Sequence, residues 1–341
     1  MKIVAVFPET PPNEKNSPLL SAEKALNLPS FFSGTGHEIV VLTDPGELDS
    51  RLEDMSVFIC SPFYPAYLTR DRIERAGQLN LVITAGVGSD HIDLEAARKH
   101  HISVVEVTGC NVVSVAEHTV MSILILLRDF LEGHRQVVQG EWNLPKIGAR
   151  AHDLEGKTVG IVGFGRIGQL VAERLSPFQV RIVHYDPLHP VSLHGSEPVS
   201  LEELIKTSDI VTIHTPLTKY TDGSFNRELL SYMKKGAYLI NTARGKIVET
   251  DALLEALETG HLAGYAGDVW YPQPAPGDHP WRTMPNHAMT IHYSGMTLEA
   301  QQRIADGVKD ILIRFIHNIP MKPENVIVEN GIIKNTSYRV K

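Results

Sequence analysis

Short runs that are apolar at nearly every position recur along the whole chain, and they constrain its fold more than any other feature. Such runs lack the alternation of a half-buried strand and predict strands covered on both faces, as in parallel sheets. Helical stretches separate them, so the pattern predicts an α/β protein with two doubly wound parallel-sheet units. The strands are predicted at residues 2–7, 38–43, 57–60, 81–85 and 103–107, and again at 158–163, 180–186, 209–215, 237–242, 264–270 and 289–294.

The length of the chain also favours two domains, because 341 residues exceed what one hydrophobic core usually holds. Between the two groups of strands we predict a linking helix at residues 114–130, with Ser114 and Glu117 at the spacing of a capping box. Its later turns are apolar on nearly all sides, so we expect both domains or a second subunit to bury it. A long helix is predicted at about 297–317. The chain after residue 294 is too short for a domain, and we expect it to pack back onto the first unit.

Charge and cysteine content exclude several classes of protein. The net charge is −8 and no block of like charges occurs, which argues against a nucleic-acid or membrane-surface partner. Cys60 and Cys110 are too few for a disulfide framework or a zinc site, and no metal site is predicted. The apolar run at residues 2–7 is too short for a signal peptide or a membrane span. We therefore expect a cytoplasmic protein.

A glycine-rich turn follows the strand predicted at residues 158–163. Gly163, Gly165 and Gly168 form a G-x-G-x-x-G pattern that opens a helix, where backbone N–H groups can bind a pyrophosphate. The next predicted strand ends at Asp186, whose carboxylate can bind a ribose diol and repel a 2′-phosphate. No cation stands at the two following positions to reverse that preference, so NAD is favoured over NADP. In the alternative interpretation, the glycines only shape a turn.

Seven motifs of the chain are "SPFYPAYLT" (61–69), "TAGVGSDHIDL" (84–94), "EVTGCNVVSVAEH" (106–118), "GFGRIG" (163–168), "NTARGK" (241–246), "AGYAGDVWYPQPAPGDHPWRTMP" (263–285) and "IHYSGMT" (291–297). Together they resemble the D-2-hydroxyacid dehydrogenases and, within that family, the NAD-dependent formate dehydrogenases. They span most of residues 57–297. The resemblance implies a flavodoxin-like catalytic domain of residues 1–112 and 295–341, and a Rossmann NAD-binding domain of residues 113–294 that includes the linking helix. It also implies a homodimer.

The resemblance implies a set of catalytic and substrate-binding residues. Arg244 follows a predicted strand, at the sheet edge where ligands collect, and its planar guanidinium can hold a carboxylate in a fixed orientation. The implied catalytic residues are Arg244, His292, Gln273 and Asn111; the implied substrate-binding residues are Val87, Asn111, Arg244, Pro62 and Phe63. The sequence departs from the family pattern at Tyr64, Ile291 and Met296.

Gln273 distinguishes two chemistries within the family. In the general hydroxyacid members a glutamate pairs with the histidine that corresponds to His292, and it raises the pKa of the imidazole so that it can donate a proton to a 2-oxo group. A neutral amide can orient the imidazole but stabilises its charge poorly. Oxidation of formate breaks a C–H bond and moves no hydroxyl proton, so Gln273 favours formate as the substrate and direct hydride transfer to the nicotinamide.

The resemblance also implies the residues that surround NAD, and two alternatives stay open. One alternative is a 2-hydroxyacid or glyoxylate-type dehydrogenase, and the other is a non-catalytic NAD(H)-sensing scaffold. The implied cofactor-binding residues are Gly163, Gly165, Arg166, Ile167, Gly168, Asp186, Pro216, Leu217, Thr218, Lys219, Tyr220, Thr242, Asp268, His292, Tyr293, Ser294 and Gly295.

Overall fold

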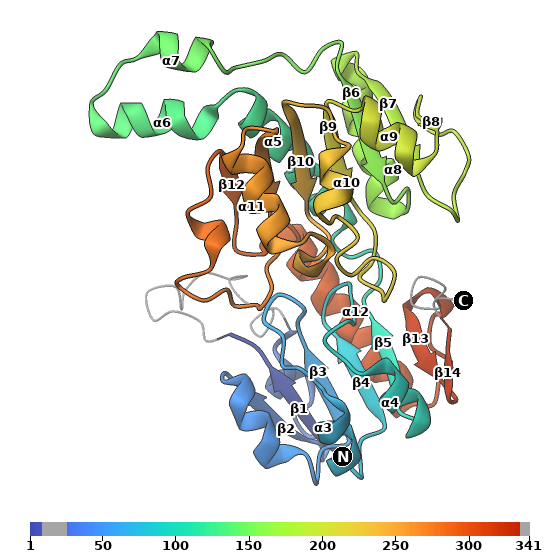
Figure 1. Cartoon of the computed structure of the whole chain (residues 1–341). Coiled ribbons are helices and arrows are strands. Elements are labelled where there is room, and N and C mark those ends of the chain that lie inside the picture. Colours follow the sequence, from blue (N-terminus) through green and yellow to red (C-terminus); the bar gives the residue numbers. More distant parts are fainter. Residues whose placement is uncertain (9–25, 335–341) are drawn as a thin grey trace. The chain divides into compact units, whose positions relative to one another are not determined.

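The computed structural model describes residues 1–8 and 26–334. The chain divides into two compact units, each built around its own sheet (Figure 1). The first unit joins Met1–Asn111 with Met296–Lys341, and the second is Val112–Gly295. Among the described residues, no helix is long and apolar enough to cross a membrane.

The first unit contains a seven-stranded sheet in the order β2-β1-β3-β4-β5-β13-β14. Its first five strands are parallel in the flavodoxin-like order, while β13 pairs antiparallel with β5 and with β14. The strands are β1 (Lys2–Val6), β2 (Glu38–Leu42), β3 (Val57–Cys60), β4 (Leu81–Thr84), β5 (Ser103–Glu106), β13 (Val326–Glu329) and β14 (Ile332–Ile333). The helices are α2 (Leu28–Phe31), η2 (Pro45–Arg51), α3 (Arg70–Arg75), α4 (Leu94–Lys99), α12 (Leu298–Ile316) and η6 (Pro323–Asn325).

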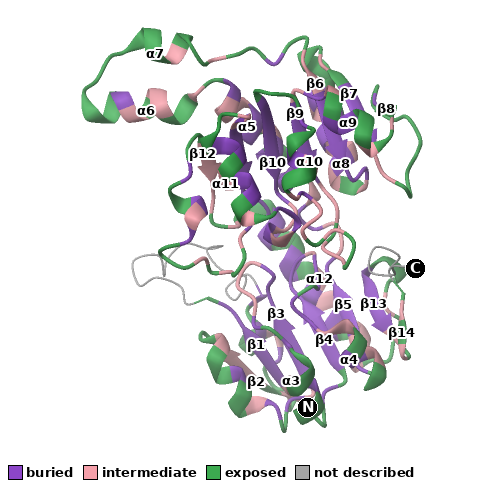
Figure 2. Ribbon diagram, viewed as in Figure 1, coloured by how far each residue is buried: buried purple, intermediate pink, exposed green. Residues whose placement is uncertain are grey.

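Both faces of this sheet are covered, which explains the continuous apolar runs of its strands (Figure 2). Alternate side chains of β1 belong to different cores. Ile3 and Ala5 pack with α2 and α12, whereas Val4 and Val6 pack with η2, α3 and α4. The helix predicted at 297–317 is α12, and its buried side chains belong to the core of the first unit.

The second unit contains a seven-stranded sheet in the order β8-β7-β6-β9-β10-β11-β12, parallel throughout. The order of its first six strands in the chain is that of the Rossmann fold. The strands are β6 (Thr158–Val162), β7 (Arg181–Tyr185), β8 (Glu197–Pro198), β9 (Ile210–Ile213), β10 (Ala237–Asn241), β11 (Leu262–Gly267) and β12 (His287–Met289). The helices are α5 (Val112–Leu127), α6 (Phe130–Gln139), α7 (Leu144–Gly148), α8 (Arg166–Leu175), η3 (Ser176–Phe178), α9 (Leu201–Thr207), α10 (Arg227–Ser231), η4 (Gly245–Ile247), α11 (Thr250–Glu258) and η5 (Pro280–Arg282). The predicted fold class is thus confirmed in both units.

Two local predictions were wrong. The strand predicted at 289–294 ends at Met289, because the following residues turn to bring backbone N–H groups to a buried carboxylate. The linking helix starts at Val112 and ends at Leu127, so Ser114 lies inside the helix and does not cap it.

The second unit buries the linking helix only in part: Val120, Leu124 and Leu126 stay half-buried and Met121 is 39% exposed, so burial of this remaining surface by the other domain or a second subunit stays a prediction. The apolar side chains of Ala116, Ile123 and Leu127 on this helix are buried within the second unit, in one core with α8 and the sheet. The chain then continues as α6 and α7, the "arm" of residues 130–148, whose side chains are mostly exposed or half-buried (Figure 2).

Candidate active site

The residues singled out from the sequence follow the carboxyl ends of parallel strands, where doubly wound folds bind ligands. In the second unit Gly163 follows β6, Asp186 follows β7 and Pro216 lies beyond β9, while Arg244, Asp268 and His292 lie beyond β10, β11 and β12. In the first unit Pro62 lies beyond β3, Val87 beyond β4 and Asn111 beyond β5. Each sheet thus presents its candidate residues at one edge.

The glycine-rich turn has a steric reason for each glycine. A Cβ on Gly163, whose φ is 94°, would lie 2.7 Å from the backbone of His214, and one on Gly168 would lie 2.3 Å from the Gly163 oxygen. A Cβ on Gly165 would meet nothing within 4 Å, so the turn is open on that side. Gly165 is also the N-cap residue of α8, whose first N–H groups can bind an anion. Arg166 and Ile167 form the first turn of that helix. This geometry fits the pyrophosphate of a dinucleotide.

Asp186 is held by the turn it faces. Its carboxylate accepts from the N–H groups of Phe164 (2.7 Å) and Leu188 (2.8 Å). His189 Nδ1 lies 3.3 Å from the same carboxylate, so an imidazole that the sequence did not indicate stands beside it. The sequence did not indicate His189, because it reaches Asp186 only through a turn of the chain over residues 186–189.

Two loops of the second unit meet at Arg244. Asn241, buried at the end of β10, shapes the first loop: its side chain donates to the Arg244 carbonyl (2.9 Å) and accepts from the Ala243 N–H (3.0 Å). A Cβ on Gly245 would lie 2.5 Å from the backbone of Trp270, so only glycine permits this approach. The arginine loop therefore packs directly on the proline-rich loop 268–281.

The proline-rich loop brings Gln273 to His292. The His292 Nδ1 donates to Gln273 Oε1 at 2.8 Å, as the sequence predicts, although 18 residues separate the pair. The Trp270 indole N–H donates to the Thr290 carbonyl at 2.6 Å and ties the loop to the histidine segment. His292 itself has a φ of 62°, a left-handed conformation that is uncommon outside glycine and clusters at functional sites.

Asp268 holds the turn that carries His292. Its side chain is fully buried and accepts from the Thr290 hydroxyl (2.5 Å) and from the N–H groups of Tyr293 (3.0 Å) and Ser294 (2.8 Å). A buried carboxylate is tolerated when several donors satisfy it. Sequence reasoning predicted a contact of Asp268 with the cofactor and missed its role as the anchor of the His292 turn.

His118, on α5, is a further residue at this turn that sequence reasoning did not single out. Its Nε2 lies 3.4 Å from the Thr290 hydroxyl, and its ring meets that of Tyr293 edge to face with centroids 5.1 Å apart. Burial lowers the pKa of His118 despite the nearby charge of Asp268. The imidazole is thus favoured in its neutral form, in which it can hydrogen-bond Thr290 without a charge.

The remaining predicted cofactor residues lie on the same edge of the second sheet. The loop after β9 is closed by the Thr221 hydroxyl, which donates to the Pro216 carbonyl at 2.7 Å and accepts from the Thr218 N–H at 2.8 Å. Thr242 is buried, and its hydroxyl lies 3.2 Å from that of Thr119 on α5. The other members of this group are Leu217, Lys219, Tyr220 and Gly295.

In the first unit, the two loops expected to form the substrate wall are in close contact. A Cβ on Gly86, whose φ is 149°, would lie 2.8 Å from Pro62 Cγ and 3.4 Å from Phe63 Cε2. Phe63 and Val87 both pack against the same hydrophobic core. The Asn111 side chain is buried, and its Oδ1 has no hydrogen-bond partner among the described residues.

Comparison with known proteins identifies the class of protein. Residues 120–294 match the family described as D-isomer specific 2-hydroxyacid dehydrogenase, NAD binding domain. The chain is 48% identical to the mitochondrial formate dehydrogenase of Solanum tuberosum, over 97% of this chain and 90% of that protein. It is 44% identical to the formate dehydrogenase of Candida boidinii, over 99% of this chain and 98% of that protein.

A solved structure agrees with these relatives. The crystal structure of the NAD-dependent formate dehydrogenase of Staphylococcus aureus in complex with NAD matches with a TM-score of 0.93 and 62% identity, over 96% of this chain and 99% of that one. The chain therefore belongs to the D-isomer specific 2-hydroxyacid dehydrogenase family, in the group whose members are named formate dehydrogenases.

Proposed function

We propose that this protein oxidises formate with NAD⁺: HCOO⁻ + NAD⁺ → CO₂ + NADH. The observation that carries the proposal is the 2.8 Å bond between His292 and the neutral amide of Gln273. A carboxylate in that place would stabilise an imidazolium ready to protonate a 2-oxo group, whereas the amide only orients the ring. The names of the relatives at 44–62% identity support the same reaction.

The substrate is a small anion, and Arg244 is the residue proposed to hold its carboxylate. The planar guanidinium suits a bidentate carboxylate contact, which fixes the C–H bond for transfer. Asn111 is proposed to donate from its amide nitrogen to a formate oxygen. Because NAD⁺ accepts the hydride when it is bound, no protein side chain has to accept the electrons or the proton of the C–H bond.

NAD⁺ is the proposed cofactor because the glycine turn and Asp186 fit a dinucleotide. The open face of Gly165 and the N-terminus of α8 suit the pyrophosphate, and the Asp186 carboxylate suits the ribose diol. Pro62, Phe63 and Val87 are proposed to form an apolar wall. A dry wall favours the transition state, in which the opposite charges of formate and nicotinamide are being neutralised.

A substrate comparison tests the proposal. Formate and NAD⁺ should produce NADH, whereas pyruvate, glyoxylate or hydroxypyruvate with NADH should react little. Faster turnover of any of these 2-oxo acids than of formate would show a 2-hydroxyacid dehydrogenase instead. Tight binding of NADH without turnover of any of these anions would show a non-catalytic scaffold.

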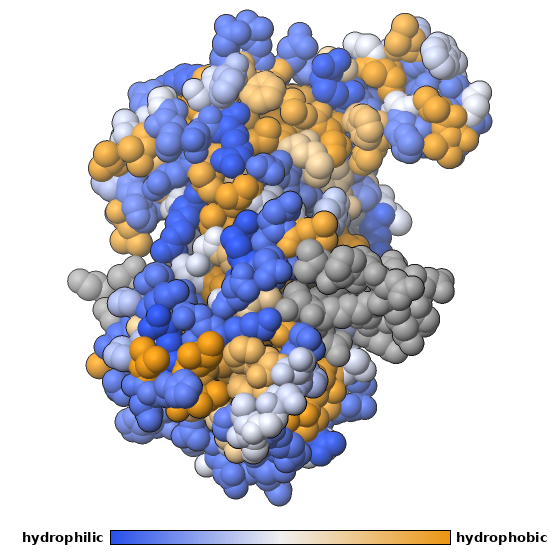
Figure 3. Space-filling model, turned by 180° about the vertical axis from the view of Figure 1, so that it is seen from behind, coloured by the Kyte–Doolittle hydropathy of each residue, from blue (hydrophilic) through white to orange (hydrophobic). Residues whose placement is uncertain are grey.

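We propose three further properties of the protein, of which the domain division and the homodimer follow from the family. Residues 1–112 and 295–341 form the substrate domain, and residues 113–294 form the NAD-binding domain. The protein forms a homodimer, and the arm supports this proposal because it exposes Val137, Val138, Trp142 and Leu144 by 66–89% (Figure 3). The location is cytoplasmic, although the named plant relatives are mitochondrial or chloroplastic.

A further inference from the structure

Glu106 is a buried acid at the edge of the first sheet that no role described so far explains. It is the last residue of β5 and only 2% exposed. Its Oε2 accepts from the Gly88 N–H at 3.1 Å and from the Ser89 hydroxyl at 3.2 Å, and its Oε1 accepts from the Thr108 hydroxyl at 3.2 Å. Burial of a carboxylate is costly unless donors of this kind compensate it, so the carboxylate and its donors hold one another in place.

Two of the three donors, Gly88 and Ser89, belong to the loop that carries Val87, whereas Thr108 follows β5. Gly86 and Gly88 flank Val87 and have φ values of 149° and 106°. Because glycine restricts the backbone least, this loop needs contacts from outside to hold its conformation. The Thr84 hydroxyl lies 2.9 Å from the Ser89 hydroxyl, which extends the contacts of Glu106 back to the end of β4. The carboxylate thus fixes the far side of a loop whose near side, at Gly86, touches Pro62.

We propose that Glu106 is a positioning residue for the substrate wall. It holds the backbone of Gly88 and Ser89 so that Val87 stays at the distance from Pro62 and Phe63 that admits a one-carbon acid and excludes larger ones. This inference rests on the proposed oxidation of formate. A glutamine in its place would keep the size but present an NH₂ group to hydrogen-bond donors, so the loop would shift.

The test is Glu106→Gln, assayed with formate and NAD⁺. The loss of a charge-assisted hydrogen bond predicts a rise of about tenfold in KM for formate. The dissociation constant for NADH should stay within about twofold of the wild-type value, because the glycine turn is in the other unit. Acetate, tested as a competitive inhibitor, should gain affinity relative to formate, an effect that general destabilisation of the unit does not produce.

Asp93→Ala is the matched control. Asp93 caps α4 in the same unit by accepting from the Ala96 N–H at 2.8 Å, so this change lowers the stability without touching the loop. The Asp93→Ala variant should have the same KM for formate and the same inhibition by acetate as the wild type.

Two results would overturn the inference. One is a folded Glu106→Gln variant that oxidises formate with unchanged KM and unchanged discrimination against acetate. If that variant does not fold, Ser89→Ala removes one donor to the same carboxylate and should raise KM less steeply; an unchanged KM there would also overturn it. A wild-type protein that does not oxidise formate would instead contradict the proposed function itself.

Discussion

Arg244 occupies a loop position that the backbone determines closely, and its side chain is the one that we propose to bind the substrate carboxylate. The Asn241 side chain and the contact of Gly245 with Trp270 fix that loop, and the guanidinium adds one bond, from its Nη1 to the Ala243 carbonyl at 2.8 Å. A change of the side chain alone should therefore leave the loop in place. Substitution of Arg244 therefore tests substrate binding while the loop keeps its conformation.

We predict that Arg244→Ala lowers kcat/KM for formate by at least about a thousandfold, because charge-assisted bidentate contacts and orientation are both lost. NADH binding, measured by fluorescence titration, should be unchanged. Arg244→Lys keeps the charge without the planar fork and should recover little of the activity. Turnover close to that of the wild type in Arg244→Ala would remove this residue from the site.

Gln273→Glu tests the chemistry of the histidine pair. A carboxylate 2.8 Å from Nδ1 would raise the pKa of His292 and keep the imidazolium to higher pH. We expect a narrower pH profile of kcat/KM for formate and a gain in glyoxylate reduction, both measured in steady-state assays. A profile that superimposes on that of the wild type would contradict our account of the glutamine.

At the scale of elements, α12 approaches the sheet of the first unit more closely than most side chains allow. A Cβ on Gly307 would lie 2.2 Å from Val107 Cγ1, just beyond β5. Overpacking of this kind costs about 1–3 kcal/mol. We therefore predict that Gly307→Ala lowers the free energy of unfolding of the first unit by about 1–3 kcal/mol, measured by urea denaturation.

Two variants control for other effects of the alanine at position 307. Val107→Ala combined with Gly307→Ala should lose less stability than the two single changes add up to, because the clash is shared. Gly133→Ala in α6, whose Cβ would meet nothing nearer than 4.0 Å, should be neutral or stabilising by up to about 1 kcal/mol. Equal destabilisation at positions 133 and 307 would contradict the close approach of α12.

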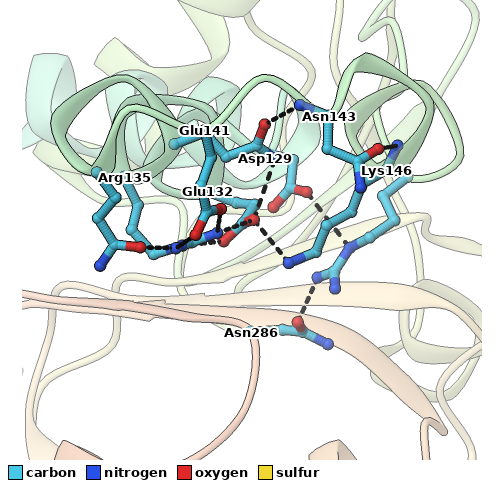
Figure 4. A network of polar contacts seen from close by, with 10 residues as sticks. Asp129, Glu132, Arg135, Glu141, Asn143, Lys146 and Asn286 are labelled. Carbon is cyan, nitrogen blue, oxygen red and sulfur yellow. Dashed lines mark hydrogen bonds and ion pairs between the residues drawn. The ribbon is translucent and has the colours of Figure 1, made fainter.

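The arm of α6 and α7 is held together by charges and not by an apolar core (Figure 4). The Glu132 carboxylate on α6 forms ion pairs with Arg135 Nε of the same helix and with Lys146 Nζ of α7, each at an N···O distance of 2.7 Å. The Gln136 side chain accepts from the Asn143 N–H at 2.7 Å and closes the turn between the helices. At the base of the arm, Arg150 pairs with Asn286 and with Asp129.

Acid should therefore loosen the arm. The hydrogen bonds from Arg135, Lys146 and Gln136 hold the pKa of Glu132 far below its usual value. Its stabilising effect is present above the pKa of the unfolded chain, about 4.3, and is lost as the pH falls below that value. Glu132→Gln should lower the urea midpoint near pH 7, and the difference from the wild type should shrink as the pH falls below about 4. An equal difference at both pH values would mean that the charge is not responsible.

At the scale of the whole molecule, the arm should also decide whether the protein dimerises. The linking helix α5 has most of its apolar surface covered within its own unit, so the exposed apolar residues of the arm are the stronger basis for an interface. We predict that Val138→Glu, at a side chain 71% exposed, converts the dimer to a monomer in light scattering.

Val191→Glu is the matched control, because Val191 is 63% exposed on the loop after β7 and not on the arm. It should leave the mass in solution unchanged. A wild-type protein that is monomeric at all concentrations, or a Val138→Glu variant that stays dimeric, would contradict the proposed interface.

The local sequence determined the strands and the glycine turn, whereas the pairing of Gln273 with His292 was implied by the family resemblance. Strand period and glycine spacing depend on a few neighbouring residues, so β3 was predicted to the residue and most other strands within one or two residues. The strands β8 and β14 were missed, because two residues give too little periodicity, and β13 was missed as well.

Only the tertiary structure decided how those parts are held in place. Asp268 anchors the turn of His292, Gly245 admits the backbone of Trp270, and Glu106 grips the loop of Val87. In each case the partners come from different segments of the chain, and no local pattern encodes which donors a buried carboxylate will meet. The sequence by itself therefore indicated the candidate catalytic groups, whereas packing between distant segments decided what orients them.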